Sequence, residues 1–158
     1  RKNLDALAQA WPLVRREHPD LTLALAGPPH PRRDALFSGM PGARLLGRLP
    51  DPLVPGLVAA ASAIVVPSTY EGFGLPALEG MAAGVPVVAA RCAALPEVGG
   101  DGGLLVDPEP VALAQGLLDV LAGGPDVADL VRRGRERAGG FTWERSAAGH
   151  AAVWAALG

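Results

Sequence analysis

The sequence predicts an α/β domain in which a parallel β-sheet is covered by helices on both faces. Short apolar runs of four to seven residues, typical of buried strands, alternate with segments whose apolar residues recur at helical spacing. The chain has 158 residues, 49% of them hydrophobic, which suits one domain with a sizeable core. No internal repeat or low-complexity linker divides it.

The part of the chain up to Ser68 predicts three helices that alternate with three strands. Leu4, Leu7 and Val14 fall at helical spacing, and Pro12 interrupts the hydrogen bonding of that helix. "LTLALAG" is typical of a buried strand closed by glycine, whereas "LVPGLVAAA" predicts a helix weakened by proline and glycine. In order, we expect a helix over 3–18, a strand over 21–27, a short helix over 34–38, a strand over 43–47, a helix over 53–61 and a strand over 63–68.

The rest of the chain predicts two more strands and four more helices. Gly84 supplies a helix stop that Pro86 follows, and Thr142 can cap the last helix. In order, we expect a loop over 69–74, a helix over 75–83, a strand over 85–90, a loop containing Pro96 and Glu97, a strand over 103–106, and helices over 107–121, 127–138 and 143–157.

Composition argues against several partners. The formal charge of −2 gives no general attraction to nucleic acid or to a membrane surface, and aromatic residues at 4% are too few for base-stacking platforms. A single cysteine favours a reducing compartment, so we expect a cytoplasmic protein. No apolar run approaches the ~20 residues of a spanning helix, and no signal peptide is visible. Peripheral membrane contact of a longer parent protein is not indicated.

The stretch "STYEGFGLPALEG" holds the residues that point to a ligand. It follows the strand over 63–68, and ligands of parallel sheets bind outside the carboxyl ends of strands. A helix that starts near Leu75 directs free N–H groups and partial positive charge toward its N-terminus. Gly72 and Gly74 let backbone approach a ligand closely, and Pro76 suits the first turn. Together these features predict a phosphate site.

Two carboxylates flank this phosphate site, and they need another partner because they would repel phosphate. Carboxylates accept hydrogen bonds from paired hydroxyls, so Glu79 could hold a ribose and Glu71 a sugar beyond the phosphates. A sugar, a diphosphate and a ribose in a row describe a nucleotide-sugar. The alternative is that both glutamates are solvated surface charges and the glycines are turn residues.

The longer stretch "VVPSTYEGFGLPALEGMAAGVPVVAA" resembles the signature of the retaining glycosyltransferases with the GT-B fold, of family four or group 1 type. "ALPEVGGDGGLLVDP", "FTWERSA" and "RKNLDALAQAW…HPDLTLALAG" are similar to that family too, so the resemblance covers nearly the whole chain. The signature is matched by Pro67, Ser68, Glu71, Gly72, Phe73, Gly74, Leu75, Pro76, Glu79, Gly84, Pro86 and Val87.

The resemblance implies a role for each matched site residue. It implies that Glu71 is the catalytic glutamate near the transferred sugar and that Glu79 holds the ribose hydroxyls. Lys2 would bind the donor diphosphate, and Leu49 would border the base, although Leu49 could equally belong to the core. The remaining donor-binding residues implied are those of the loop against sugar and phosphates: Gly72, Phe73, Gly74 and Leu75.

Metal binding has no support in the sequence, because there is no Asp-x-Asp pair and no His/Cys cluster. The resemblance implies a metal-independent reaction without a cofactor, in which cationic side chains and the helix end stabilise the leaving diphosphate.

The resemblance also implies a domain organisation. Residues 1–158 would form one Rossmann-like, three-layer, nucleotide-sugar-binding domain, the C-terminal half of a GT-B fold. Its first strand would precede Arg1, and an N-terminal acceptor-binding domain would lie elsewhere in the parent protein. The partner expected is a UDP-, GDP- or ADP-sugar donor. We expect this chain alone to be inactive.

Two other functions compete with glycosyl transfer. One is a non-catalytic module that binds a sugar nucleotide or another protein. The other is a dinucleotide-dependent oxidoreductase, disfavoured because no G-x-G-x-x-G follows any expected strand. The base, the sugar and the acceptor stay open at this point.

Overall fold

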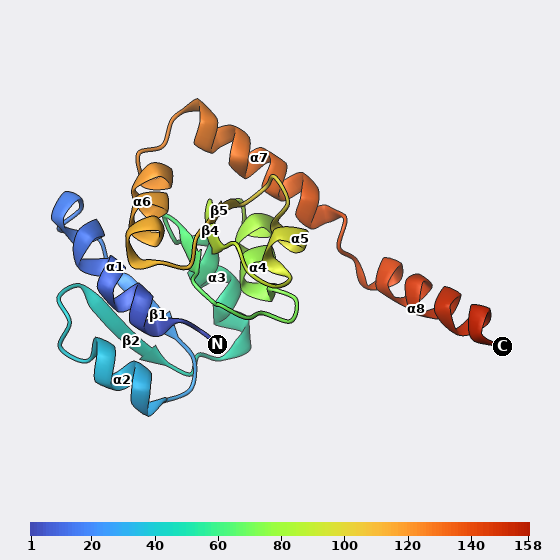
Figure 1. Ribbon diagram of the computed structural model, residues 1–158, viewed down its shortest axis with the longest axis horizontal. Coiled ribbons are helices and arrows are strands. Elements are labelled where there is room, and N and C mark those ends of the chain that lie inside the picture. The colour runs from blue at the N-terminus through green and yellow to red at the C-terminus, as the bar shows by residue number, and fades with distance from the viewer.

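The computed structural model describes all 158 residues and has the α/β architecture that the sequence predicts (Figure 1). The strands are β1 (Leu23–Ala26), β2 (Ala43–Gly47), β3 (Ile64–Val66), β4 (Val87–Ala90) and β5 (Leu104–Val106). The helices are α1 (Leu4–Glu17), α2 (Pro31–Phe37), α3 (Val54–Ala59), α4 (Leu75–Ala83), α5 (Leu95–Gly99), α6 (Pro110–Leu121), α7 (Pro125–Gly139) and α8 (Trp143–Leu157), with a 3-10 turn η1 (Asp51–Leu53).

Prolines account for the main differences from the expected elements. The loop expected around Pro96 and Glu97 is wrong, because these residues lie in the first turn of helix α5. Helix α2 likewise begins at Pro31, earlier than expected. A proline in the first turn costs little, since its missing N–H would have no partner there. Helix α1 continues through Pro12 to Glu17.

All strand pairs are parallel, but they form two sheets instead of one. Strand β1 pairs with β2, and β3, β4 and β5 pair in that order.

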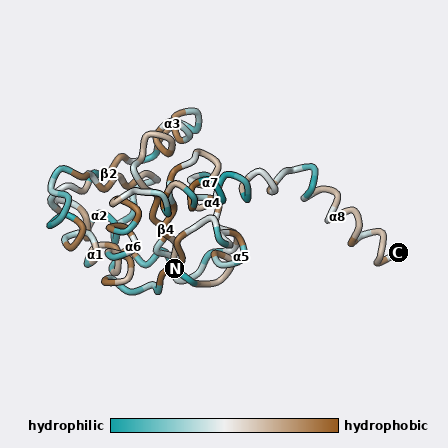
Figure 2. Tube along the Cα trace, turned by 90° about the horizontal axis from the view of Figure 1, so that it is seen from above, coloured by the Kyte–Doolittle hydropathy of each residue, from teal (hydrophilic) through white to brown (hydrophobic).

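Strand β4 lies between two hydrophobic layers. Val88 belongs to a core cluster with α1 and α6, whereas Val87 and Ala89 belong to a cluster with α4 and α5. Neighbouring residues of a strand point to opposite faces, so a strand buried on both faces is apolar throughout. All four residues of β4 are buried, and Figure 2 shows hydrophobic colour around this strand.

Helix α8 stands apart from the rest of the chain. It projects away from the body of the domain (Figure 1), and all of its residues are exposed. Trp143 and Trp154 are among its largest exposed side chains. No single helix is long and apolar enough to cross a membrane; only α6 and α7 together, bent by 99°, meet the length and composition criteria.

Candidate functional site

The loop between β3 and α4, residues 69–74, forms the centre of the candidate site. It starts at the carboxyl end of β3, as expected for a ligand site in a parallel sheet. Gly74 ends the loop as the N-cap of α4, with a left-handed φ of 103°. The backbone amides of residues 72–75 donate no hydrogen bond to any protein acceptor. Gly74 is buried, but Gly72, Phe73 and Leu75 are exposed, so their N–H groups are free for a ligand at the positive end of the helix dipole.

The N-terminal residues lie beside this loop. Lys2 Nζ donates to both carboxylate oxygens of Glu71 at 3.0 Å, which joins residues 69 positions apart in the sequence. Thr69 N–H donates to the carbonyl of Arg1 at 2.9 Å, and the Arg1 guanidinium lies 5.0 Å from the centre of the Tyr70 ring. The side chain of Glu71 is only 14% exposed, so the ion pair is partly shielded from water. Two cations thus contact the loop, Lys2 through Glu71 and Arg1 through Tyr70.

Two of the predicted donor-binding residues are not joined to this cluster. Glu79 lies on an exposed face of α4 and makes no hydrogen bond or ion pair with the protein. Its carboxylate is therefore open to a ligand. Leu49 follows β2 in the other sheet and is half-buried, and no hydrogen bond links residues 48–50 to the loop.

A cavity of about 260 Å³ lies elsewhere, against α1, whereas a larger one of about 1040 Å³ adjoins the loop. We define the large one as the loop cavity. It is lined by Phe73 and Leu75 from the loop region, by α5, by α7 and by the start of α8. Phe73 meets Phe141 there in an edge-to-face contact, with ring centres 5.7 Å apart. Sequence reasoning missed Phe141, although it opens the family-like "FTWERSA".

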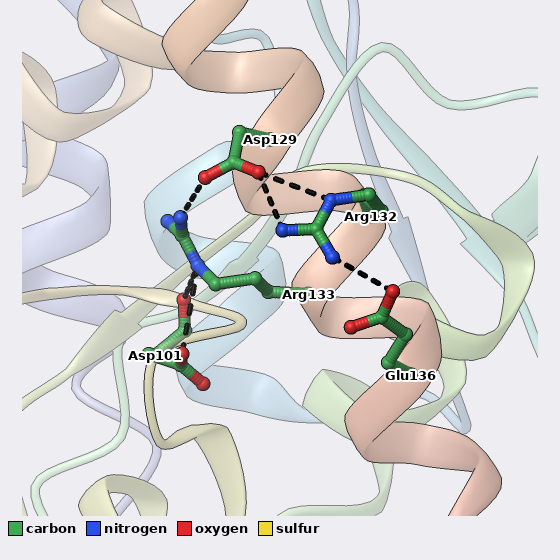
Figure 3. A network of polar contacts seen from close by, with 5 residues as sticks. All are labelled: Asp101, Asp129, Arg132, Arg133 and Glu136. Carbon is green, nitrogen blue, oxygen red and sulfur yellow. Dashed lines mark hydrogen bonds and ion pairs between the residues drawn. The ribbon is translucent and has the colours of Figure 1, made fainter.

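Helix α7 forms one wall of the loop cavity and carries an exposed charge network (Figure 3). Arg132 bonds Asp129 and Glu136, and Arg133 bonds Asp129. The hydrogen bond from Arg132 holds the pKa of Asp129 below its ordinary value. Arg133 also donates to the carbonyl of Asp101 at 2.9 Å, which ties α7 to the glycine turn before β5. This network fixes the wall and lies outside the loop itself.

No three His, Cys, Asp or Glu side chains lie close enough together to hold a metal ion. The loop itself carries the Glu71 carboxylate, and two cations contact it: the Lys2 ammonium, which pairs with Glu71, and the Arg1 guanidinium, which lies over the Tyr70 ring. Such a site presents hydrogen-bond donors and cations to an anion, and carboxylates to hydroxyl groups.

Comparison with known proteins assigns the family. Residues 1–123 match the model of the family described as Glycosyl transferases group 1. The O-antigen chain mannosyltransferase B of Escherichia coli is 40% identical over 155 residues, which cover 91% of this chain and 40% of that protein. A glycogen synthase of Mycobacterium tuberculosis is 35% identical over 162 residues, which cover 96% of this chain and 39% of that protein. The chain thus spans well under half the length of these relatives.

Solved structures confirm the predicted fold class. Sucrose-phosphate synthase from Thermosynechococcus elongatus superposes with a TM-score of 0.83 at 30% identity, over 99% of this chain and 42% of that one. A glycosyltransferase from Rickettsia africae has the same fold with a TM-score of 0.74 at 22% identity, over 87% of this chain and 39% of that one. The family model, the sequence relatives and the fold agree, and the chain belongs to the group 1 glycosyl transferases.

Proposed function

We propose that this chain is the donor-binding domain of a retaining glycosyltransferase. The parent protein transfers a sugar from a nucleoside diphosphate to an acceptor and keeps the configuration of the anomeric carbon. Residues 1–158 bind the nucleotide-sugar as one domain, and the remainder of the parent binds the acceptor. The chain by itself binds nucleotide without turning over. The short share of the relatives' length that it covers supports this division.

One observation carries the proposal: four consecutive amides at the start of α4 have no protein acceptor, three of them on exposed residues, and the loop that holds them carries the Lys2–Glu71 ion pair. Free amides at a helix N-terminus suit a phosphate group. The neighbouring ammonium adds a positive charge, which stabilises a leaving diphosphate without a metal ion. Glu71 is held in place by the same ammonium, so its carboxylate has a fixed orientation for sugar hydroxyls.

The unpaired carboxylate of Glu79 fits the far side of such a donor. It lies in the second turn of α4 and has no protein partner. A ribose diol can donate two hydrogen bonds to one carboxylate. The ribose would keep the phosphates, which a carboxylate repels, away from Glu79. In this arrangement the diphosphate binds the loop and Lys2, the sugar reaches Glu71 and the ribose reaches Glu79. Leu49 stays a looser assignment, at the base.

The base stays open among uracil, guanine and adenine. Relatives of different kinds match the chain, among them the GDP-mannose-dependent alpha-(1-6)-phosphatidylinositol dimannoside mannosyltransferase of Mycobacterium tuberculosis, 35% identical over 139 residues, which cover 87% of this chain and 36% of that protein. The decisive first experiment is therefore calorimetry of the chain with UDP, GDP and ADP. We expect one of them to bind, and the melting temperature to rise with its concentration. Absence of binding by all three would contradict a donor site in this chain.

Substitution in the full-length protein tests the roles of the two glutamates. We expect Glu79→Ala to weaken donor binding, because it removes a ribose contact, and Glu71→Ala mainly to lower turnover. Glu17→Ala is the matched control, since Glu17 is exposed at the end of α1 and its carboxylate makes no hydrogen bond with the protein. Unchanged kinetics for both site variants would refute the assignment. A parent protein that binds nucleotide but transfers no sugar would favour a non-catalytic binding module.

A further inference from the structure

The Phe73–Phe141 contact joins the site loop to a distant part of the sequence. Phe141 lies in the short link between α7 and α8, and its ring meets Phe73 at 79°, close to perpendicular. Both rings are partly exposed, 43% for Phe73 and 39% for Phe141, and neither belongs to a core cluster. An edge-to-face pair gains energy from the positive edge of one ring on the negative face of the other. This pair is therefore a specific contact at the loop and does not hold the core together.

Arg137 is a second neighbour of the Phe141 ring. Its guanidinium lies 5.8 Å from the centre of the Phe141 ring, within the range of a cation–π interaction. The same guanidinium donates to the carbonyl of Val98 at 2.6 Å and to the carbonyl of Glu97. Because these carbonyls belong to α5, the position of Phe141 is tied to that helix.

The start of helix α5 also contacts the loop, at Glu71 and Gly74. The N–H of Ala94, just before α5, donates to the carbonyl of Glu71 at 3.4 Å. The side chain of Leu95 packs so closely under Gly74 that a Cβ added there would lie 2.8 Å from Leu95 Cδ2. The loop is thus held at Phe73 by Phe141 and at Glu71 and Gly74 by α5. Arg137 is the residue that touches both supports.

We propose that Phe141, oriented by Arg137, is a positioning residue that holds the Glu71–Leu75 loop in the geometry that receives the donor. The proposal rests on the proposed donor site. Phe141 touches the loop through Phe73 and has no part in the chemistry. Loss of its ring leaves the core intact but lets Phe73, and with it the free amides, leave their positions. Donor affinity then falls because the loop must be ordered on binding.

The contact can be measured without any ligand. The chain has three phenylalanines, so 4-fluorophenylalanine labelling gives three ¹⁹F resonances. We expect Phe141→Leu to remove one resonance and to broaden that of Phe73, because the loop becomes mobile; loss of the neighbouring ring current by itself only shifts the resonance. The resonance of Phe37, which is buried in the core far along the sequence, serves as the internal control and stays in place. A Phe73 resonance that keeps its linewidth would overturn the proposal.

Nucleotide affinity supplies the second readout. With whichever of UDP, GDP or ADP binds the unsubstituted chain, we expect Phe141→Leu to raise the Kd between about twofold and tenfold, the range that one aromatic pair corresponds to. Phe141→Tyr keeps the ring and should restore the affinity. Trp154→Leu is the matched control, because this exposed aromatic residue lies on α8 and has only His150 as an aromatic neighbour. The melting temperature should fall by only a few degrees for Phe141→Leu, about what one aromatic pair is worth, and should stay unchanged for Phe141→Tyr and Trp154→Leu.

The two proposals fail in different ways. If the unsubstituted chain binds none of the three nucleotides, the donor site is contradicted, and the linewidth of the Phe73 resonance still tests whether Phe141 positions the loop. If the chain binds nucleotide and Phe141→Leu binds it equally well, the positioning role is refuted and the donor site stands. A loss of affinity that Phe141→Tyr fails to restore would also count against the aromatic contact.

Discussion

Substitution of Gly74 by alanine tests the packing on which the site loop rests. Gly74 caps α4 with φ at 103°, a conformation that L-residues rarely adopt. An added Cβ would also lie 2.8 Å from Leu95 Cδ2. Leu95 is fully buried, so its side chain has little room to move aside. Alanine therefore meets both backbone strain and a steric clash.

The two effects have separate magnitudes. A left-handed backbone costs an L-residue about 1–2 kcal/mol, and overpacking a filled core costs about 1–3 kcal/mol. We therefore expect Gly74→Ala to lower the free energy of unfolding by about 2–5 kcal/mol. With a urea dependence of about 2 kcal/mol/M, the unfolding midpoint falls by about 1–2.5 M. Urea unfolding followed by circular dichroism measures this shift.

Gly72→Ala is the matched control in the same loop. Gly72 has no positive φ, and nothing lies within 4 Å of the position of an added Cβ. Its stability should stay within about 0.5 kcal/mol of the unsubstituted chain. A double-mutant cycle with Leu95→Ala separates clash from strain, because only the clash depends on Leu95. If Gly74→Ala and Gly72→Ala unfold at the same urea concentration, the reasoning is refuted.

Three further substitutions test other parts of the fold. Gly102→Ala should destabilise by about 1–3 kcal/mol in urea unfolding, since its Cβ would lie 2.6 Å from the Gly134 backbone; a neutral result would show that α7 can move away. Leu113→Ala, in the fully buried core, should lower the free energy of unfolding by about 2–5 kcal/mol, and a loss below 1 kcal/mol would contradict tight packing. The backbone N–H of Glu144 and the Thr142 hydroxyl lower the pKa of the Glu144 carboxyl from its ordinary 4.5. The ionised carboxylate therefore stabilises the start of α8 fully above pH 4.5, and this stabilisation is lost as the pH falls through the lower pKa of the folded state. NMR Cα shifts of residues 143–157 should show this loss of helix in acid, and Glu144→Gln should abolish the dependence.

Local sequence patterns predicted most of the elements near the site. The apolar run "AIVVPS" predicted β3, and Gly84 with Pro86 predicted the end of α4 and the start of β4. These features depend on neighbours in the sequence, so local propensity decides them. The loop that the sequence predicts at Pro96 is wrong because a proline favours a loop and a first helical turn alike. The contacts of the surrounding elements resolve that ambiguity.

The sequence did not predict which side chains contact the loop. Phe141 is distant from Phe73 in the chain, and nothing local to either residue specifies their contact. The ion pair between Lys2 and Glu71 depends in the same way on where α1 begins relative to β3. The division of the strands into two sheets was not predicted, because strand patterns do not tell which strands pair.

The sequence by itself determined the order of strands and helices and the position of a glycine-rich loop, with one carboxylate before α4 and one within it. It could do so because hydrophobic spacing and glycine and proline positions act over a few residues. Only the tertiary structure decided which side chains hold that loop: Lys2, Leu95 and Phe141 reach it from three separate segments. The physical reason is that such contacts depend on the packing of whole elements, which places residues far apart in the sequence within a few ångströms.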